Sequence, residues 1–86
     1  MVPIQKLLDR IRWDRRFGND YFEIGYEDHV ERKIVRLPFE KVKFKESDRS
    51  SFQMEDEEGR VRTIPFHRIR EVYKGGRLIW RRPPSH

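Results

Sequence analysis

The chain has 86 residues, of which 41% are charged and 35% are hydrophobic, and it contains no cysteine. This length predicts one domain with a compact core, and the lack of cysteine excludes disulfides and thiolate metal sites. No apolar run approaches the roughly 20 residues that a membrane-spanning helix needs. We therefore expect a cytoplasmic protein with no membrane partner. The scarcity of Asn, Gln and Met beside many charges is typical of thermophile proteins.

Positive charge is concentrated at the two ends of the sequence. Residues 1–16 carry a net charge of +3, residues 17–59 carry −5, and residues 60–86 carry +7. Fourteen of the 20 basic residues are arginines, whose planar side chains match phosphate and stack on bases. If the two ends meet in the fold, they form one surface that attracts polyanions. The alternative is that these arginines form surface ion pairs that support thermal stability.

An amphipathic helix is predicted at the N-terminus, after Pro3, with a stripe at Ile4, Leu7, Leu8 and Ile11. Trp13 falls opposite this stripe, beside Lys6 and Arg10. There it would be a platform on which a base stacks. The alternative is that the helix ends near Arg12 and Trp13 folds back into the core.

The middle of the chain reads as short strands separated by turns. Phe17–Asp20 is predicted to be a turn. Alternation then predicts strands at 21–26, 33–39, 51–55 and 60–64. Residues 40–45 fit a helical turn or a strand, and we favour a short helix, followed by a loop at 46–50. The acidic run 55–58 lacks the spacing of a cation site and reads as a solvated turn.

Gly75-Gly76 predicts the turn of a final hairpin. A regular ladder then pairs Lys74 with Arg77, Tyr73 with Leu78, Val72 with Ile79, Glu71 with Trp80 and Arg70 with Arg81. The expected core face carries Ile69, Tyr73, Leu78 and Trp80, and the other face carries Arg70, Val72, Lys74, Arg77, Ile79 and Arg81. Like charges placed opposite each other cost stability. This arrangement favours an anionic partner, unless acids such as Glu71 neutralise the face.

Together these elements predict an α+β fold, in which an N-terminal amphipathic helix packs on a mostly antiparallel, strongly bent sheet of about five to six strands. Residues 1–82 would form a single RNA-binding domain, and residues 83–86 a frayed tail.

Several strings resemble a family of small archaeal basic proteins, the RNA cyclic group end recognition domain, which also occurs fused to RNA-repair and RNA-end-processing enzymes. The strings are Ile11–Asp14, Phe22–Asp28, Leu37–Phe39, Ile64–Ile69 and Gly76–Arg81, of which Ile-Pro-x-His-Arg-Ile is the most specific. The chain departs from the family pattern at His29, where the family has Arg. The resemblance implies recognition of RNA ends, including 2′,3′-cyclic phosphates, in concert with an RNA-processing enzyme.

His67 is the natural candidate for acid–base chemistry. With Arg68 on a phosphoryl oxygen and Asp28 orienting the imidazole, next to Tyr26, it would resemble a phosphodiester site. However, a second acid–base group, a phosphate loop and a zinc-ligand cluster are all missing from the sequence. We therefore favour binding over catalysis, and expect neither metal nor cofactor.

The leading hypothesis is a monomeric RNA-binding module for single strands or RNA ends. Phosphates would be held by His67, Arg68, Arg70, Arg77 and Arg81, with Arg12 or Arg15 helping. Tyr26, Trp13 or Trp80 would stack on a base, beside Asp28. One alternative is an RNA-terminus phosphodiesterase or nuclease that uses His67. The other is a protein-interaction adaptor whose acidic middle segment contacts a basic partner.

Overall fold

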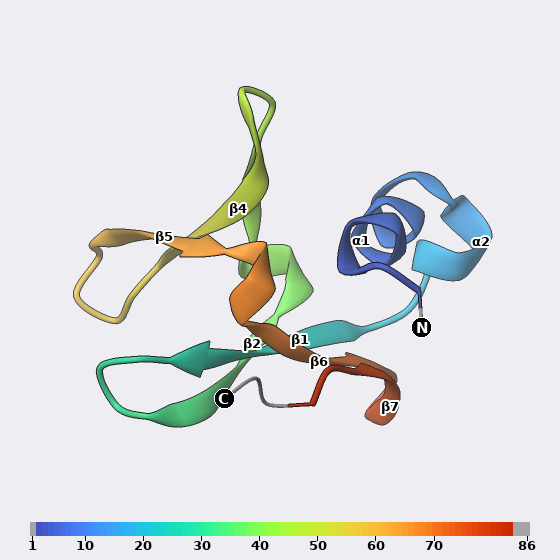
Figure 1. Cartoon of the computed structure of the whole chain (residues 1–86). Helices are drawn as coiled ribbons and strands as arrows, with labels where there is room; N and C mark the ends of the chain where they lie inside the picture. Colours follow the sequence, from blue (N-terminus) through green and yellow to red (C-terminus); the bar gives the residue numbers. More distant parts are fainter. Residues whose placement is uncertain (1, 84–86) are drawn as a thin grey trace.

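The computed structural model describes residues 2–83 and contains two antiparallel sheets and an N-terminal helix (Figure 1). The elements are α1 (Ile4–Trp13), α2 (Arg15–Gly18), β1 (Phe22–Asp28), β2 (Lys33–Pro38), η1 (Phe39–Lys41), β3 (Lys43–Lys45), β4 (Asp48–Glu55), β5 (Val61–Pro65), η2 (Phe66–Arg68), β6 (Ile69–Lys74) and β7 (Arg77–Arg81). The α+β class is confirmed. The predicted strand count is wrong, because the described residues form seven strands, arranged in two sheets.

The two sheets are a four-stranded sheet, in the order β2-β1-β6-β7, and a three-stranded sheet, in the order β3-β4-β5. Figure 1 shows α1 and the β4–β5 hairpin standing on the same side of the four-stranded sheet. One cluster of buried side chains, drawn from α1 and from both sheets, fills the space between them. Burial of this apolar surface is the main force that holds the layers together.

Helix α1 forms where the apolar stripe predicts it, and all four stripe residues are buried. Trp13, the last residue of α1, is 71% exposed, so the alternative in which it folds back into the core is wrong. The first two residues of the turn predicted at Phe17–Asp20 belong instead to the end of the short helix α2. Asp14 caps α2 by accepting hydrogen bonds from the N–H groups of Arg16 and Phe17. Gly18 allows α2 to approach α1, since a Cβ there would lie 2.2 Å from the carbonyl oxygen of Ile11.

The ambiguous segment at 40–45 contains both predicted structures, because the 3₁₀ turn η1 is followed by strand β3. The loop predicted at 46–50 is wrong in part, since β4 already begins at Asp48. The Asp48 carboxylate accepts hydrogen bonds from the hydroxyls of Ser50 and Ser51, which stabilises the start of β4. Phe44 of β3 lies 6.2 Å from Phe66, between ring centroids, and so ties β3 to η2.

The final hairpin turns at Gly75-Gly76 as predicted, and both glycines have positive φ. The pairs Lys74–Arg77 and Tyr73–Leu78 are confirmed. The other three pairs are wrong, because a bulge after Val72 shifts the register and places Val72 opposite Trp80 and Glu71 opposite Arg81. The bulge lets Val72 and Trp80 share the buried face, so the expected core face is also wrong at Tyr73 and Leu78, which are not buried.

This shift replaces the expected Arg70–Arg81 pair. Arg81 lies opposite Glu71 rather than Arg70, which is a favourable cross-strand combination. Beyond β7 the N–H group of Arg82 donates to the carbonyl of Arg70, so the ladder continues to the end of the predicted domain. The predicted tail at 83–86 lies mostly outside the described residues. Pro83 is described, and its carbonyl accepts a hydrogen bond from the Arg70 side chain.

Candidate functional site

Basic side chains from residues 62–82, and none from the N-terminal segment 1–16, lie around one end of the four-stranded sheet. The antiparallel register places Tyr26 of β1 opposite Ile69 of β6, so the end of β1 lies beside η2. The end of β7 completes this edge, because Arg82 continues the ladder beside Arg70. We call the basic side chains at this edge the basic end: Arg62, His67, Arg68, Arg70, Arg81 and Arg82.

Two members of the basic end are neutralised by carboxylates. Arg70 pairs with Glu27 at 3.5 Å, and Arg62 reaches from β5 to Asp28 at 3.4 Å. Asp28 is buried and also accepts hydrogen bonds from the N–H groups of Val30 and Glu31. These backbone donors, with help from Arg62, hold the pKa of Asp28 below its ordinary value against the opposing effect of burial.

Three arginines of the basic end, Arg68, Arg81 and Arg82, form no ion pair within residues 2–83. Arg82 is held in place without a carboxylate: its side chain donates to the carbonyl of His67 at 2.8 Å and lies 5.2 Å from the Trp80 ring centroid. The Nε atom of Arg68 is buried and has no hydrogen-bond partner among the described residues. Because buried donors are almost always paired in folded proteins, the guanidinium of Arg68 is not fully satisfied by the protein itself.

The basic end contains four of the five residues predicted to hold phosphate: His67, Arg68, Arg70 and Arg81. Arg77 lies at the other end of the β6–β7 hairpin, next to the Gly75-Gly76 turn. Four residue steps along β7, or roughly 13 Å, separate Arg77 from Arg81. Arg62 and Arg82 were missed by the sequence reasoning. Arg62 lies on the same face of β5 as the buried Ile64, but its pairing with Asp28 depends on how the two sheets pack.

The three aromatic residues predicted to stack on a base differ in their surroundings. Tyr26 is 1% exposed, its hydroxyl donates to the Met54 sulfur, and burial raises its pKa. Trp80 is 6% exposed and its indole N–H donates to the carbonyl of Val2 at 2.7 Å. Both rings therefore belong to the core, whereas Trp13 projects from the surface.

The arrangement expected of a phosphodiester site is not formed in the described part of the chain. Both oxygens of Asp28 are engaged, one by the two backbone N–H groups and the other by Arg62. No hydrogen bond joins Asp28 to His67, whose side chain is exposed. Asp28 thus stabilises the β1–β2 turn and the packing of the two sheets instead of orienting an imidazole.

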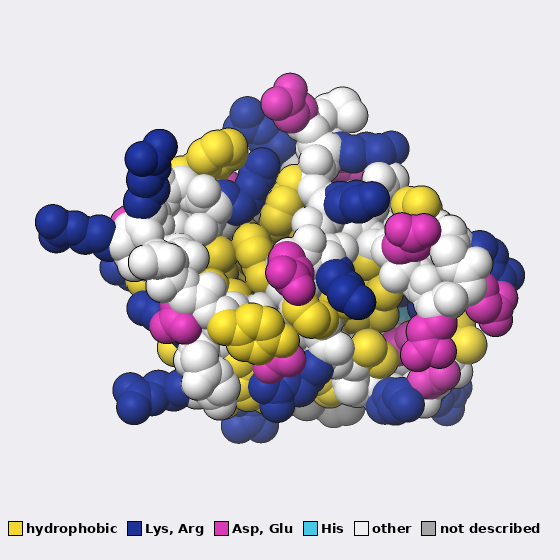
Figure 2. All heavy atoms as spheres, turned by 180° about the vertical axis from the view of Figure 1, so that it is seen from behind, with side chains coloured by type: hydrophobic (Ala, Val, Ile, Leu, Met, Phe, Trp, Pro, Cys, Tyr) yellow, Lys and Arg dark blue, Asp and Glu magenta, His cyan; other side chains and the backbone are white. Residues whose placement is uncertain are grey.

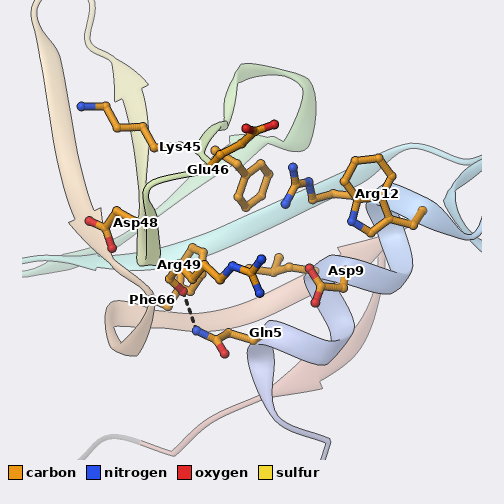
Figure 3. A pocket seen from close by; sticks show the side chains of 11 residues that line it. Gln5, Asp9, Arg12, Lys45, Glu46, Asp48, Arg49 and Phe66 are labelled. Atoms are coloured by element: carbon orange, nitrogen blue, oxygen red, sulfur yellow. Dashed lines mark hydrogen bonds between the residues drawn. The ribbon is translucent and has the colours of Figure 1, made fainter.

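A separate cavity of about 510 Å³ lies between α1 and the β3–β4 connection (Figure 3). We call it the α1 cavity; its lining residues are Gln5, Leu8, Asp9, Arg12, Trp13, Phe44, Lys45, Glu46, Asp48, Arg49 and Phe66. Figure 3 shows Arg12 reaching from α1 toward the opposite wall, and Arg49 reaching from β4 toward Asp9. Sequence reasoning missed this cavity, because one wall is the segment whose secondary structure was ambiguous.

One face of the molecule mixes side chains of both charges (Figure 2). Figure 2 shows Lys and Arg side chains spread around one face of the molecule, with Asp and Glu side chains among them and hydrophobic side chains between. Several cations are paired, as in Arg36–Glu23 and Lys33–Glu31. In residues 2–83 there is no group of three or more His, Asp or Glu side chains that could hold a metal ion, and no helix is long and apolar enough to cross a membrane.

These features define a small, basic α+β protein with a cation-rich sheet end and an aromatic-lined cavity. Residues 1–82 match the family model described as the MJ1316 RNA cyclic group end recognition domain. The chain belongs to this family, which confirms the resemblance seen in the sequence. The family description indicates RNA ends as the ligand class. No curated protein and no solved structure matches the chain.

Proposed function

We propose that residues 1–82 act as one domain that binds a phosphate-bearing end of single-stranded RNA, including a 2′,3′-cyclic phosphate, at the basic end. Arg68, Arg81 and Arg82 hold the phosphate oxygens, and His67 adds a hydrogen-bond donor. The domain serves as a monomeric accessory to an RNA-repair or RNA-processing enzyme, and RNA turnover is left to that enzyme.

The observation that carries this proposal is the surplus of positive charge at the basic end. Arg62 and Arg70 form ion pairs with Asp28 and Glu27, while Arg68, Arg81 and Arg82 form no ion pair in the described range, although Glu71 lies opposite Arg81 in the sheet. Fixed guanidinium groups bind phosphate through short, charge-assisted hydrogen bonds. The contact between Arg82 and the His67 carbonyl holds one of these groups in place before any ligand arrives, which lowers the entropy cost of binding.

The proposal is tested by fluorescence anisotropy with single-stranded RNAs of about ten nucleotides, within the usual ~4–16-nucleotide range of small binding domains. One RNA ends in a 2′,3′-cyclic phosphate and a matched RNA ends in hydroxyls. We expect tighter binding of the cyclic-phosphate end. We also expect affinity to fall with salt, with a log–log slope of about −0.7 for each phosphate that the protein neutralises on the single strand.

A variant with Arg68→Ala and Arg81→Ala isolates the basic end. Each charged hydrogen bond contributes about 1.5–3 kcal/mol, so the double variant should bind at least about a hundredfold more weakly. The matched control is Arg60→Ala, which removes an arginine that pairs with Asp56 and Glu58 in the β4–β5 turn. Equal losses in both variants, or equal affinity for the two RNA ends, would contradict the proposal.

A further inference from the structure

A second cavity, of about 500 Å³, lies at the turn between β1 and β2. We call it the turn pocket; its lining residues are Glu27, Asp28, His29, Arg32, Lys33 and Ile34. The turn lies at the same end of the four-stranded sheet as the basic end, because Tyr26 near the end of β1 is opposite Ile69, the first residue of β6. Figure 1 shows the turn projecting beyond the sheet on that side.

Two ion pairs join the turn pocket to the basic end. Glu27 lines the pocket and lies 3.5 Å from Arg70, and Asp28 lines it and lies 3.4 Å from Arg62. Each carboxylate of the pocket wall therefore has an arginine partner from the basic end. Because these charges are already compensated, the wall adds little repulsion toward a phosphate.

Arg32 is the one charged side chain of the pocket lining that forms no ion pair in residues 2–83. Its neighbour Lys33 pairs with Glu31 at 3.0 Å. No aromatic ring in the same range stacks on the Arg32 guanidinium. The charge of Arg32 is therefore available to a ligand.

The backbone of Arg32 is strained. Its φ of 55° makes it the one residue other than glycine with a positive φ among the described residues. The Cβ of an L-residue makes this conformation costly, and glycine would avoid the cost. No ion pair or aromatic contact of the side chain within the described chain offsets it. A strained residue that the fold itself does not explain points to a role in function.

The sheet sets the separation between Arg32 and the basic end. Strands β2 and β6 flank β1, and neighbouring strands lie about 4.8 Å apart, so β2 lies roughly 10 Å from β6. Along the strands, the Asp28–Lys33 pair lies two residues, or roughly 7 Å, beyond the Tyr26–Ile69 pair. A single RNA strand stacked as in a duplex advances about 3.4 Å per nucleotide. A few nucleotides therefore span the separation.

From this geometry we infer that Arg32 holds an internal phosphate of the RNA, a few nucleotides in from the end that the basic end binds. The inference rests on the proposed function, because it extends the path of the same RNA strand. The guanidinium offers a fork of N–H donors that matches phosphate oxygens. His29, which lines the same pocket, brings one further N–H donor. A mononucleotide is too short to reach Arg32 from the basic end.

The test compares two ligands in the variant Arg32→Gly. The first is the cyclic-phosphate RNA of about ten nucleotides, followed by anisotropy, and the second is uridine 2′,3′-cyclic monophosphate, followed by NMR titration. The RNA should bind about tenfold more weakly, because one charged contact is lost. Its log–log salt slope should become shallower by about 0.7. The mononucleotide should bind as it does to wild type, and Tm should not fall, because glycine relieves the strain.

The second variant, Arg32→Asn, removes the charge but keeps a side chain that tolerates the left-handed conformation. It should show the same loss of affinity for the RNA and the same shallower salt slope. The matched control is Arg60→Ala, which removes an exposed arginine from the β4–β5 turn. This control should leave both affinities and the salt slope unchanged.

Wild-type affinity and salt slope for the RNA in both Arg32 variants would overturn the inference and leave the proposed function standing. Equal weakening of the RNA and the mononucleotide would also overturn it, because Arg32 would then act on the basic end and not on a separate phosphate. Failure of the wild type to bind either ligand would instead overturn the proposed function and, with it, the inference.

Discussion

The basic end and the α1 cavity both contain arginines, but the two regions treat charge differently. At the basic end three arginines lack a carboxylate partner in residues 2–83, and the nearby rings of Tyr26 and Trp80 are buried. In the α1 cavity the charges balance, and Trp13 is exposed at the surface. Surplus charge suits a phosphate, whereas balanced charge gives a polyanion little net attraction. Arginine content alone therefore does not locate a phosphate site.

The largest expected effect comes from forcing α2 away from α1 while leaving the basic end intact. In Gly18→Ala, the new Cβ would lie 2.2 Å from the Ile11 carbonyl oxygen, so α2 must move away from α1. We expect a loss of about 3 kcal/mol in unfolding free energy and a fall of roughly 10 °C or more in Tm. The control Gly59→Ala, with φ of 82° and no close contact, should lose only about 1 kcal/mol. Equal losses would show that the α1–α2 contact is unimportant.

The next effect concerns Asp28, whose hydrogen bonds give it a structural role. The Asp28→Ala substitution removes the acceptor of the Val30 and Glu31 N–H groups. It also removes the ion-pair partner of Arg62. We expect a loss of about 2 kcal/mol at pH 7 by urea denaturation. The control Glu57→Ala, at an exposed position in the β4–β5 turn, should lie within about 0.5 kcal/mol of wild type.

The same residue gives a pH dependence. The pKa of Asp28 is lowered in the folded protein, so its contribution to stability is complete above its ordinary value of 3.8 and is lost as the pH falls through the lower folded value. Stability of Asp28→Ala should therefore change less than that of wild type across this acidic range. Parallel curves for the two proteins would contradict the role given to Asp28.

A smaller effect, of opposite sign, is expected at Arg32 in the β1–β2 turn. Arg32 has φ of 55°, a left-handed conformation that glycine adopts without strain. Arg32→Gly should stabilise the protein by about 1 kcal/mol and raise Tm by about 5 °C. His29→Gly, in the same turn but without a positive φ, should not stabilise it. A lower Tm for Arg32→Gly would show that the Arg32 side chain contributes more than its backbone strain costs.

The smallest effect concerns Asp48, which lines the α1 cavity. Ser51→Ala removes the strongest of the hydrogen bonds that lower the pKa of Asp48 to about 2, and Ser50→Ala removes a weaker one. Carboxyl NMR titration should show the pKa of Asp48 rising in both variants, and further in Ser51→Ala. A larger rise in Ser50→Ala would mean that the Ser50 hydroxyl, and not that of Ser51, has the greater effect on the pKa of Asp48.

Local patterns in the sequence predicted much of the fold and part of the site. The stripe of α1, the presence of strand β1 and the Gly75-Gly76 turn follow from spacing alone, because each depends on residues close in the chain. The structure buries Tyr26 together with Phe22 and Ile24, so its ring lies in the core and not at the surface where a base could stack.

The features that were missed depend on packing between distant elements. A Gly-Gly turn fixes only the first pairs of a hairpin. The bulge after Val72 lies beyond those pairs, and it places the Trp80 ring in the core. The partners of Arg62 and Arg70 come from β1, 34 and 43 residues away in sequence. The α1 cavity requires the packing of α1 against β3 and β4, which no local pattern encodes.

The central claim is that arginines without a carboxylate partner at the basic end hold the phosphate of an RNA end. Its most direct test is an NMR titration of the protein with uridine 2′,3′-cyclic monophosphate, following the backbone amides and the arginine Nε–H groups. We expect the largest shifts on η2 and on Arg68, Arg81 and Arg82. Shifts centred on Lys74 and Arg77 at the opposite end of the hairpin, or no shifts at the basic end, would contradict it.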